Sequence, residues 1–173
     1  MFRDIAVVAT AIGVSIPIVK KAGWLGALSL LVGISISFSL GVIIAILWGY
    51  RDAVSITTIG AGACTYIVGP VTGTALGASS DLIALSIAAG VVKAIAVALG
   101  TPLLAKSIGL DNPRTAMIFG GMMGTNAGVM AGLAATDPKL VPYGAITATF
   151  YTGLGCLLCP SVFYLVMRLL LAA

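Results

Sequence analysis

Charge is what this 173-residue sequence has least of. Only 8% of its residues are charged and 60% are hydrophobic, whereas a soluble globular domain carries roughly 25% charged residues. Glutamate and histidine are absent altogether. A chain with so few polar side chains cannot cover its surface in water. The composition therefore excludes soluble enzymes and nucleic-acid-binding proteins, despite a net charge of +4.

The missing residue types also argue against catalysis. Without His or Glu the usual general bases are lacking, and no Ser or Cys has a neighbour that would activate it. Cys156 and Cys159 form a C-x-x-C pair, but only Cys64 is available to extend it, which is too few ligands for zinc. We interpret the cysteines as packing residues and expect no enzyme, no cofactor and no metal other than a transported cation.

Long uncharged runs dominate the rest of the chain. Residues 22–50, 53–80 and 140–167 carry no charge, and about 18 apolar residues are enough for a transmembrane helix. We therefore expect one all-α integral membrane domain over residues 1–173, built as a multi-pass helical bundle. Charges and prolines divide it into six segments, 5–19, 24–48, 53–79, 82–104, 115–136 and 143–170.

Basic residues lie mainly at the ends of these segments, where they face headgroups and set orientation. If all six segments cross, one side of the membrane collects Arg3, Arg51, Lys106, Arg114 and Arg168, and the other collects Lys20, Lys21 and Lys139. That distribution favours the first side as cytoplasmic, and a re-entrant third segment would change it.

The third and fifth segments are unusually rich in Gly and Thr for membrane helices. Aligned sixty residues apart, they place Thr65 on Thr125. We expect both helices to be interrupted, the third near Gly69 and Pro70 and the fifth within 120–128, and to approach one another. Broken backbone at membrane depth is tolerated only inside protein or beside a polar cavity, so such pairs indicate a transporter's binding site. The alternative is that the glycines only allow helices to pack closely.

Candidate site residues follow from these two segments. Side-chain oxygens and freed carbonyls suit Na⁺, a hard cation, whereas freed N–H groups suit an anion. For the cation we predict Thr65, Thr125 and Asn126, with charge added by Asp81 and Asp137, the last of which a loop turn explains equally well. For an anionic substrate we predict Gly69, Thr72, Lys93, Gly124 and Arg114.

Two of these residues are basic. Lys93 lies at the middle of the fourth segment, where a lysine costs roughly 2.5–3.5 kcal/mol, so it is expected to face protein or water. Snorkelling toward the interface is its alternative role. For Arg114 we favour an anchor at the segment end over a guide for the anion.

Five motifs carry a family resemblance: FRDIAVVAT (2–10), DAVSITTIGAG (52–62), YIVGPVTG (66–73), ASSDLIALS (78–86) and LAATDPKLVPYG (133–144). They resemble MadM, the larger subunit of the two-component malonate:sodium symporters, over nearly the whole chain. The resemblance implies a bacterial inner-membrane carrier for Na⁺-coupled malonate uptake, with a small partner subunit, MadL. It also implies kinship with the cation:proton antiporter and anion transporter group, whose core holds crossed discontinuous helices. Family members extend further on the N-terminal side, so the chain is expected to be a C-terminal portion or the product of a late start.

Three interpretations of function stay open. The leading one is a Na⁺-coupled secondary carrier for malonate or a similar small dicarboxylate. The second is a carrier for another small anion or another coupling ion, because no pattern recognises two carboxylates specifically. The third is a non-transporting membrane subunit that holds a partner through its glycine-rich faces.

Overall fold

The computed structural model describes residues 16–172, and every element in that part of the chain is helical. Three helical stretches among the described residues, Trp24–Leu47, Ser80–Leu104 and Pro138–Leu171, are long and apolar enough to cross a membrane. The expected all-α fold with membrane-type helices is therefore confirmed. Most of the first expected segment, 5–19, lies outside the described residues.

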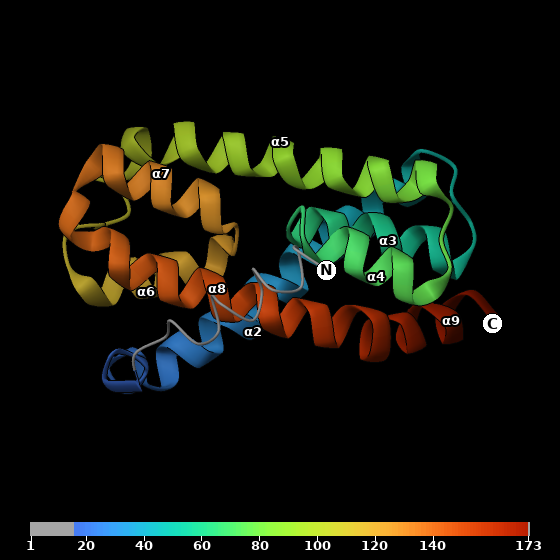
Figure 1. Cartoon of the computed structure of the whole chain (residues 1–173), viewed down its shortest axis with the longest axis horizontal. Helices are drawn as coiled ribbons and strands as arrows, with labels where there is room; N and C mark the ends of the chain where they lie inside the picture. The colour runs from blue at the N-terminus through green and yellow to red at the C-terminus, as the bar shows by residue number, and fades with distance from the viewer. Residues whose placement is uncertain (1–15, 173) are drawn as a thin grey trace. The chain divides into compact units, whose positions relative to one another are not determined.

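The helices follow one another along the chain as Figure 1 labels them. They are α2 (Ile16–Leu47), α3 (Ala53–Cys64), α4 (Val68–Leu76), α5 (Ser80–Leu104), α6 (Pro113–Met123), α7 (Asn126–Thr136), the short η1 (Pro138–Leu140), α8 (Val141–Leu158), the π-helical η2 (Cys159–Phe163) and α9 (Tyr164–Ala172). Pro17 lies in the first turn of α2, where its missing N–H has no helical partner to lose. The helix therefore continues past Pro17 instead of ending there.

Packing divides these helices into two units. Unit 1 holds α2 up to Gly33 and residues 96–153, which include the second half of α5, all of α6 and α7, and most of α8. Unit 2 holds residues 34–95 and the chain from Leu154 onward, which include α3, α4, the first half of α5, and α9. Each unit thus contains one pair of short helices.

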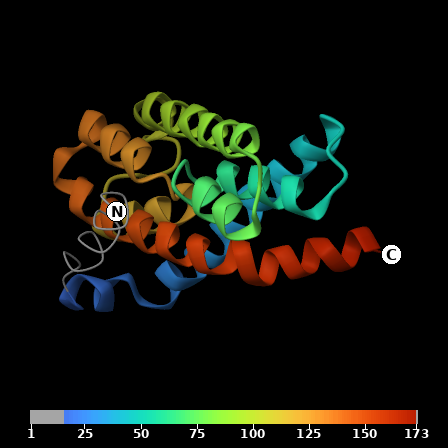
Figure 2. The same ribbon diagram turned by 45° about the vertical axis from the view of Figure 1, so that its right-hand side comes forward.

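In unit 2 the short pair forms a hairpin, here called the α3–α4 hairpin. Gly69 lies against Gly62, and Gly73 lies against Thr58. These contacts run in opposite directions along the two helices, so the helices are antiparallel, as Figures 1 and 2 show. With 12 and 9 residues they are about 18 and 14 Å long, well short of the hydrocarbon core of about 30 Å.

In unit 1 the other pair forms the α6–α7 hairpin, whose helices have 11 residues each. Gly144 of α8 touches Ala116 on α6 and both Val129 and Leu133 on α7. One helix of the third long stretch therefore holds both arms of the hairpin on a shared core. Buried members of that core are Ala105, Leu110, Ala116, Val129, Leu133, Leu140 and Ala148.

The sixty-residue repeat in the sequence is a repeat of helix starts and helix ends. Asp52 caps α3, accepting a hydrogen bond from the backbone N–H of Ser55 at 2.8 Å. Asn112, sixty residues later, caps α6 and accepts from the backbone N–H of Thr115 at 3.0 Å. Both caps satisfy N–H groups that a helix start leaves without partners.

The two helix breaks follow the same repeat. Thr65 directly follows α3, and Thr125 stands between α6 and α7. The first break lies between Cys64 and Val68, a few residues before the expected Gly69 and Pro70. Pro70 instead lies in the first turn of α4, where no intrahelical donor is required.

Asp52 gives the start of α3 a pH dependence. Burial alone would raise the pKa of Asp52, but hydrogen bonds from the backbone N–H and the hydroxyl of Ser55 outweigh it and lower the pKa below its ordinary value of 3.8. Such a carboxyl stabilises the fold above its unfolded pKa and loses that contribution as the pH falls through its folded pKa. Asp52→Asn keeps a cap without a charge. We expect its thermal stability to fall less than that of wild type between about pH 5 and pH 3, and parallel curves would contradict this.

Candidate functional site

Thr65 closes the tip of the α3–α4 hairpin, residues 64–68, by capping α4. Its Oγ1 accepts hydrogen bonds from the backbone N–H of Ile67 at 3.2 Å and of Val68 at 3.0 Å. Its carbonyl oxygen accepts from the N–H of Gly69 at 3.2 Å. The start of α4 is therefore satisfied by this one residue, and the hydroxyl oxygen that the sequence predicts as a cation ligand is already engaged.

Thr65 and Thr125 are equivalent in the repeat, but they should differ in how much their hydroxyl groups contribute to stability. Thr65→Ala removes a working cap and should lower the free energy of unfolding by about 1 kcal/mol. Thr125→Ala removes a hydroxyl that has no hydrogen-bond partner, so it should lower stability little in Na⁺-free buffer. Thermal unfolding of the two purified variants in detergent measures both effects. Equal destabilisation would contradict the contrast.

Lys93 reaches the same tip from α5. Its Nζ donates to Ser37 Oγ at 2.8 Å and to the carbonyl oxygen of Cys64 at 2.9 Å. Cys64 is the last residue of α3, whose final carbonyls lack helical partners and carry the negative end of the helix dipole. The ammonium group is thus bonded to protein at the end of α3 and does not extend toward a headgroup.

Close packing fills the rest of this tip. Gly90 of α5 lies directly against the backbone of Tyr66, and the hydroxyl of Ser86 lies against Gly69. Gly69 therefore serves a close helix contact, because a Cβ at this position would meet Ser86 and Gly62. On the same hairpin, the hydroxyl oxygens of Thr57 and of the predicted residue Thr72 are buried without a hydrogen-bond partner.

The tip of the α6–α7 hairpin, residues 123–126, is built on one glycine. Gly124 ends α6 with φ at 69°, a left-handed conformation that glycine adopts without strain. The ring of Tyr151 lies where a side chain at this position would be. Tyr151 is fully buried, and its hydroxyl donates to the carbonyl oxygen of Gly33 at 3.2 Å. Tyr151 thus fastens the tip to α2.

Two oxygens at this tip have no partner. Thr125 is fully buried, and its Oγ1 makes no hydrogen bond. The Oδ1 of Asn126 is also buried and without a partner, although its Nδ2 donates to Thr149 Oγ1 at 3.0 Å. A buried acceptor left unsatisfied costs about 1–3 kcal/mol. Two such atoms on consecutive residues are suited to a bound cation or a ligand donor.

The backbone N–H groups at the start of α7 likewise lack a side-chain partner. No side chain caps this helix, in contrast to α4, where Thr65 does so. The backbone carbonyl of Thr125 accepts from the N–H of Val129 at 2.8 Å, so the N-terminal turn is well formed. An uncapped helix start presents N–H groups and a positive dipole end, which suit a carboxylate.

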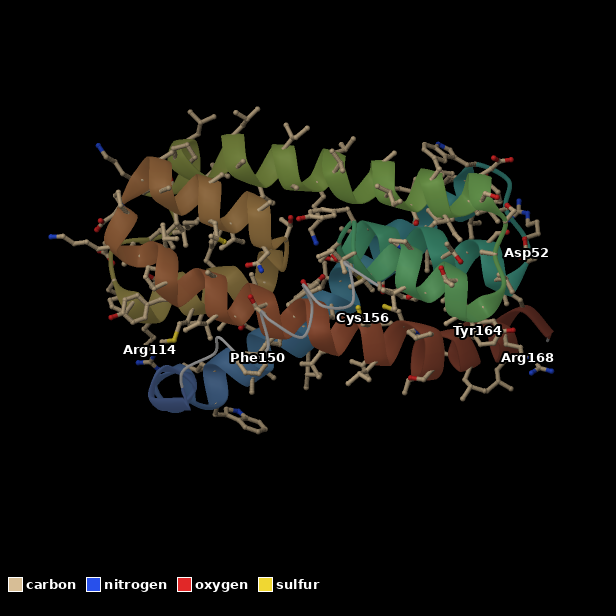
Figure 3. All side chains as sticks on the ribbon, viewed as in Figure 1. Asp52, Arg114, Phe150, Cys156, Tyr164 and Arg168 are labelled. Atoms are coloured by element: carbon tan, nitrogen blue, oxygen red, sulfur yellow. The ribbon has the colours of Figure 1, made fainter. Side chains whose placement is uncertain are left out.

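Apart from Lys93, the charged residues predicted for the site lie away from both tips. Asp81 is exposed in the first turn of α5, and Asp137 follows α7, where its carboxylate accepts from the N–H of Lys139 at 3.0 Å. Arg114 is exposed at the start of α6, at the outer end of the helix in Figure 3. These three residues therefore lie at the ends of the hairpins opposite the tips.

Sequence reasoning missed three residues that complete the tips. Ser37 is one of two hydrogen-bond partners of Lys93 given above, and Thr149 and Tyr151 hold the α6–α7 tip. The sequence held one signal, the polar cluster TFYTG (149–153) inside an otherwise apolar segment. Among the residues described, no group of three or more Cys, His, Asp or Glu could hold a metal ion.

Comparison with known proteins gives one match. The sequence profile of the family described as malonate/sodium symporter MadM subunit matches residues 1–171. No curated protein and no solved structure matches the chain.

Proposed function

This chain belongs to the malonate/sodium symporter MadM subunit family, and we propose on that premise that it is the membrane subunit of a secondary carrier that couples Na⁺ to the uptake of malonate or a similar small dicarboxylate. The carrier works in the bacterial inner membrane with a small partner subunit of the MadL kind. Membership of this family supports the substrate and the ion, and the tip of the α6–α7 hairpin supports the place where they bind.

The unpartnered oxygens of Thr125 and Asn126 are the observation that carries this proposal. Na⁺ is a hard cation and takes neutral or charged oxygen ligands, by the logic that governs other hard cations. Both oxygens are buried, and neither is used by the fold itself. A bound Na⁺ removes the cost of leaving them unsatisfied, so the site is stabilised by the ion it transports.

The substrate carboxylate binds beside the cation. The uncapped first turn of α7 offers backbone N–H groups, and the Thr125 hydroxyl donates its hydrogen to the carboxylate while its lone pairs face Na⁺. Opposite charges at adjacent positions favour each other, and binding free energies are reciprocal. Na⁺ therefore raises the affinity for the dicarboxylate, and the dicarboxylate raises the affinity for Na⁺ by the same factor.

Both hairpins are re-entrant in this proposal. Their arms are too short to span the bilayer and turn back on themselves, so α2, α5 and the stretch Pro138–Leu171 supply the crossings. With three crossings, one side of the membrane collects Lys20, Lys21, Lys106, Arg114 and Lys139, and the other collects Arg51 and Arg168. The positive-inside rule then assigns the side with Arg114 to the cytoplasm. Counting all six segments as crossings would place Arg51 on that side too.

Cysteine labelling tests this topology. In a chain whose three cysteines are replaced by Ala, a single Cys at Asp111 should react with an impermeant maleimide only after the membrane is opened, because it faces the cytoplasm. A single Cys at Gly49 should react in intact cells. Gly49 lies between α2 and α3, and Asp111 lies between α5 and α6. With re-entrant hairpins, α5 is the one crossing between them, so the two positions form a matched pair on opposite sides of the membrane. The same accessibility at both positions, whether both react in intact cells or neither does, would contradict re-entrant hairpins; six crossings predict that neither reacts.

Uptake of labelled malonate into proteoliposomes tests the function as a whole. The full chain is reconstituted with and without its small partner subunit, and uptake is measured with an inward Na⁺ gradient or with choline in its place. We expect uptake that depends on both Na⁺ and the chain. Na⁺-driven uptake of another anion but not of malonate would overturn the substrate assignment, and no uptake by the complete complex would overturn the carrier role.

A further inference from the structure

The helices that follow the two hairpins differ at one equivalent position. Lys93 lies on α5 after the α3–α4 hairpin, and Gly153 lies sixty residues later on α8 after the α6–α7 hairpin. Sixty residues is also the interval between the caps Asp52 and Asn112 and between the threonines at the tips. The repeat thus carries an ammonium group in one copy and no side chain in the other.

In the first copy the ammonium group satisfies the break. Lys93 Nζ donates to the carbonyl oxygen of Cys64, the residue before Thr65, and to Ser37 Oγ. Thr65 Oγ1 accepts hydrogen bonds from the backbone N–H groups at the start of α4. The oxygens at this tip are therefore matched by a positive charge and by N–H donors that belong to the chain.

In the second copy the oxygens are left open. Thr125 Oγ1 and Asn126 Oδ1 are buried without partners. Thr125 is equivalent to Thr65, which caps α4 in the first copy, and the position equivalent to Lys93 is Gly153. Gly153 is four residues after Thr149, so it lies on the same face of α8 as the residue that holds the Asn126 side chain. A Cβ added at Gly153 meets no atom within 4 Å.

We propose that Lys93 is a tethered cation that does for the tip of the α3–α4 hairpin what Na⁺ does for the tip of the α6–α7 hairpin, so that of these two tips the one formed by Thr125 and Asn126 holds the exchangeable cation. This inference rests on the proposed function, because it takes the α6–α7 tip as the Na⁺ site. Because the charge of Lys93 is covalently attached, the tip of the α3–α4 hairpin keeps its cation in every state of the carrier. The exchangeable charge makes the other hairpin respond to Na⁺, which is what coupling requires.

A lysine introduced at Gly153 tests the proposal by placing a tethered cation in the second hairpin. Helical side chains lean toward the N-terminus of their helix, so the side chain of Gly153→Lys runs back over Thr149 toward Asn126. Gly153→Met is the matched control, with similar length and no charge. The readout is equilibrium binding of labelled malonate and of ²²Na⁺ to the full chain, produced with its small partner subunit and purified in detergent.

We expect Na⁺ to increase malonate affinity at least tenfold in wild type and in Gly153→Met. In Gly153→Lys we expect malonate affinity to be the same with and without Na⁺, and ²²Na⁺ binding to fall at least tenfold. If Gly153→Lys keeps the full Na⁺ effect while it is folded, the proposal is overturned. If wild type itself shows no effect of Na⁺ on malonate binding, the proposed function fails instead, so the two failures are distinguishable.

A second variant decides the matter if Gly153→Lys does not fold. Lys93→Ala leaves the end of α3 without its ammonium group, and propylammonium can occupy the space that the side chain vacates. We expect propylammonium to raise the melting temperature of Lys93→Ala and to leave that of wild type unchanged. A concentration of about 10 mM is used, which is on the order of the Kd of a weak site. Propan-1-ol is the uncharged control. Absence of any rescue would overturn the tethered-cation role of Lys93.

Discussion

We expect Asn126→Ala to raise the Na⁺ concentration needed for half-maximal malonate uptake by about tenfold or more. Losing one oxygen ligand of the bound cation should cost about as much as losing a hydrogen bond to a charged group, about 1.5–3 kcal/mol, and 1.4 kcal/mol is a factor of ten. Thr125→Ala acts in the same direction. The measurement is uptake into proteoliposomes over a range of Na⁺ concentrations at fixed malonate. Expression of Thr125→Ala in the membrane fraction should stay near that of wild type, since the Thr125 hydroxyl has no partner in the fold. Asn126→Ala also loses the hydrogen bond to Thr149 Oγ1, so its uptake is normalised to the amount of protein in the vesicles.

The matched control for this experiment is Thr65→Ala. Thr65 occupies the equivalent position in the repeat, but its hydroxyl oxygen caps α4. We therefore expect a less stable protein whose half-maximal Na⁺ concentration is that of wild type. An unchanged Na⁺ dependence in both Thr125→Ala and Asn126→Ala would mean that these residues only pack helices.

We expect Lys93→Met to abolish uptake and to lower thermal stability, while the protein still inserts into the membrane. The substitution removes the hydrogen bonds to Ser37 and to the carbonyl oxygen of Cys64 and leaves that carbonyl without its charged donor. A lost hydrogen bond to a charged group costs about 1.5–3 kcal/mol. Uptake at saturating Na⁺ and a melting curve in detergent measure the two effects together.

Lys106→Met is the control for Lys93→Met, because Lys106 is an exposed lysine just after the same helix, α5. It should leave uptake and melting near those of wild type. Wild-type uptake kinetics and melting in Lys93→Met would mean that the ammonium group is not needed at the end of α3.

Much of the fold follows from composition and local pattern. Scarce charge and long apolar runs predict membrane helices, and Gly and Thr density predicts where helices end, since both residue types weaken helices at membrane depth. The break at Gly124 and Thr125 falls inside the predicted range, 120–128. The first break does not fall at Pro70, because a proline in the first turn of a helix is compatible with it.

The reversal of each hairpin could not be read from the sequence. Whether a second short helix continues across the bilayer or turns back depends on which surface it packs against. Here Gly69 packs on Gly62, a contact between two glycines that resemble many others in the chain. The approach of the two broken segments to one another stays a prediction.

Hydrogen-bond partners that lie far apart in the chain could not be predicted from the sequence either. Lys93 meets Ser37 across 56 residues, and Tyr151 meets Gly33 across 118. Thr65 and Thr125 align in the sequence as equivalent candidates, yet one hydroxyl oxygen is engaged by two N–H groups and the other by none. The difference arises from the local backbone after each residue, which a one-letter alignment does not contain.

Movement of Na⁺ itself tests the account most directly. Proteoliposomes containing the full chain and its small partner subunit are given an inward malonate gradient, with ²²Na⁺ at equal concentration on both sides. The account predicts that the malonate gradient drives net entry of ²²Na⁺, although ²²Na⁺ itself has no gradient. Vesicles without malonate should show no such entry, and vesicles with Asn126→Ala should lose it. Malonate entry that leaves ²²Na⁺ at its starting distribution would contradict coupling at the α6–α7 hairpin.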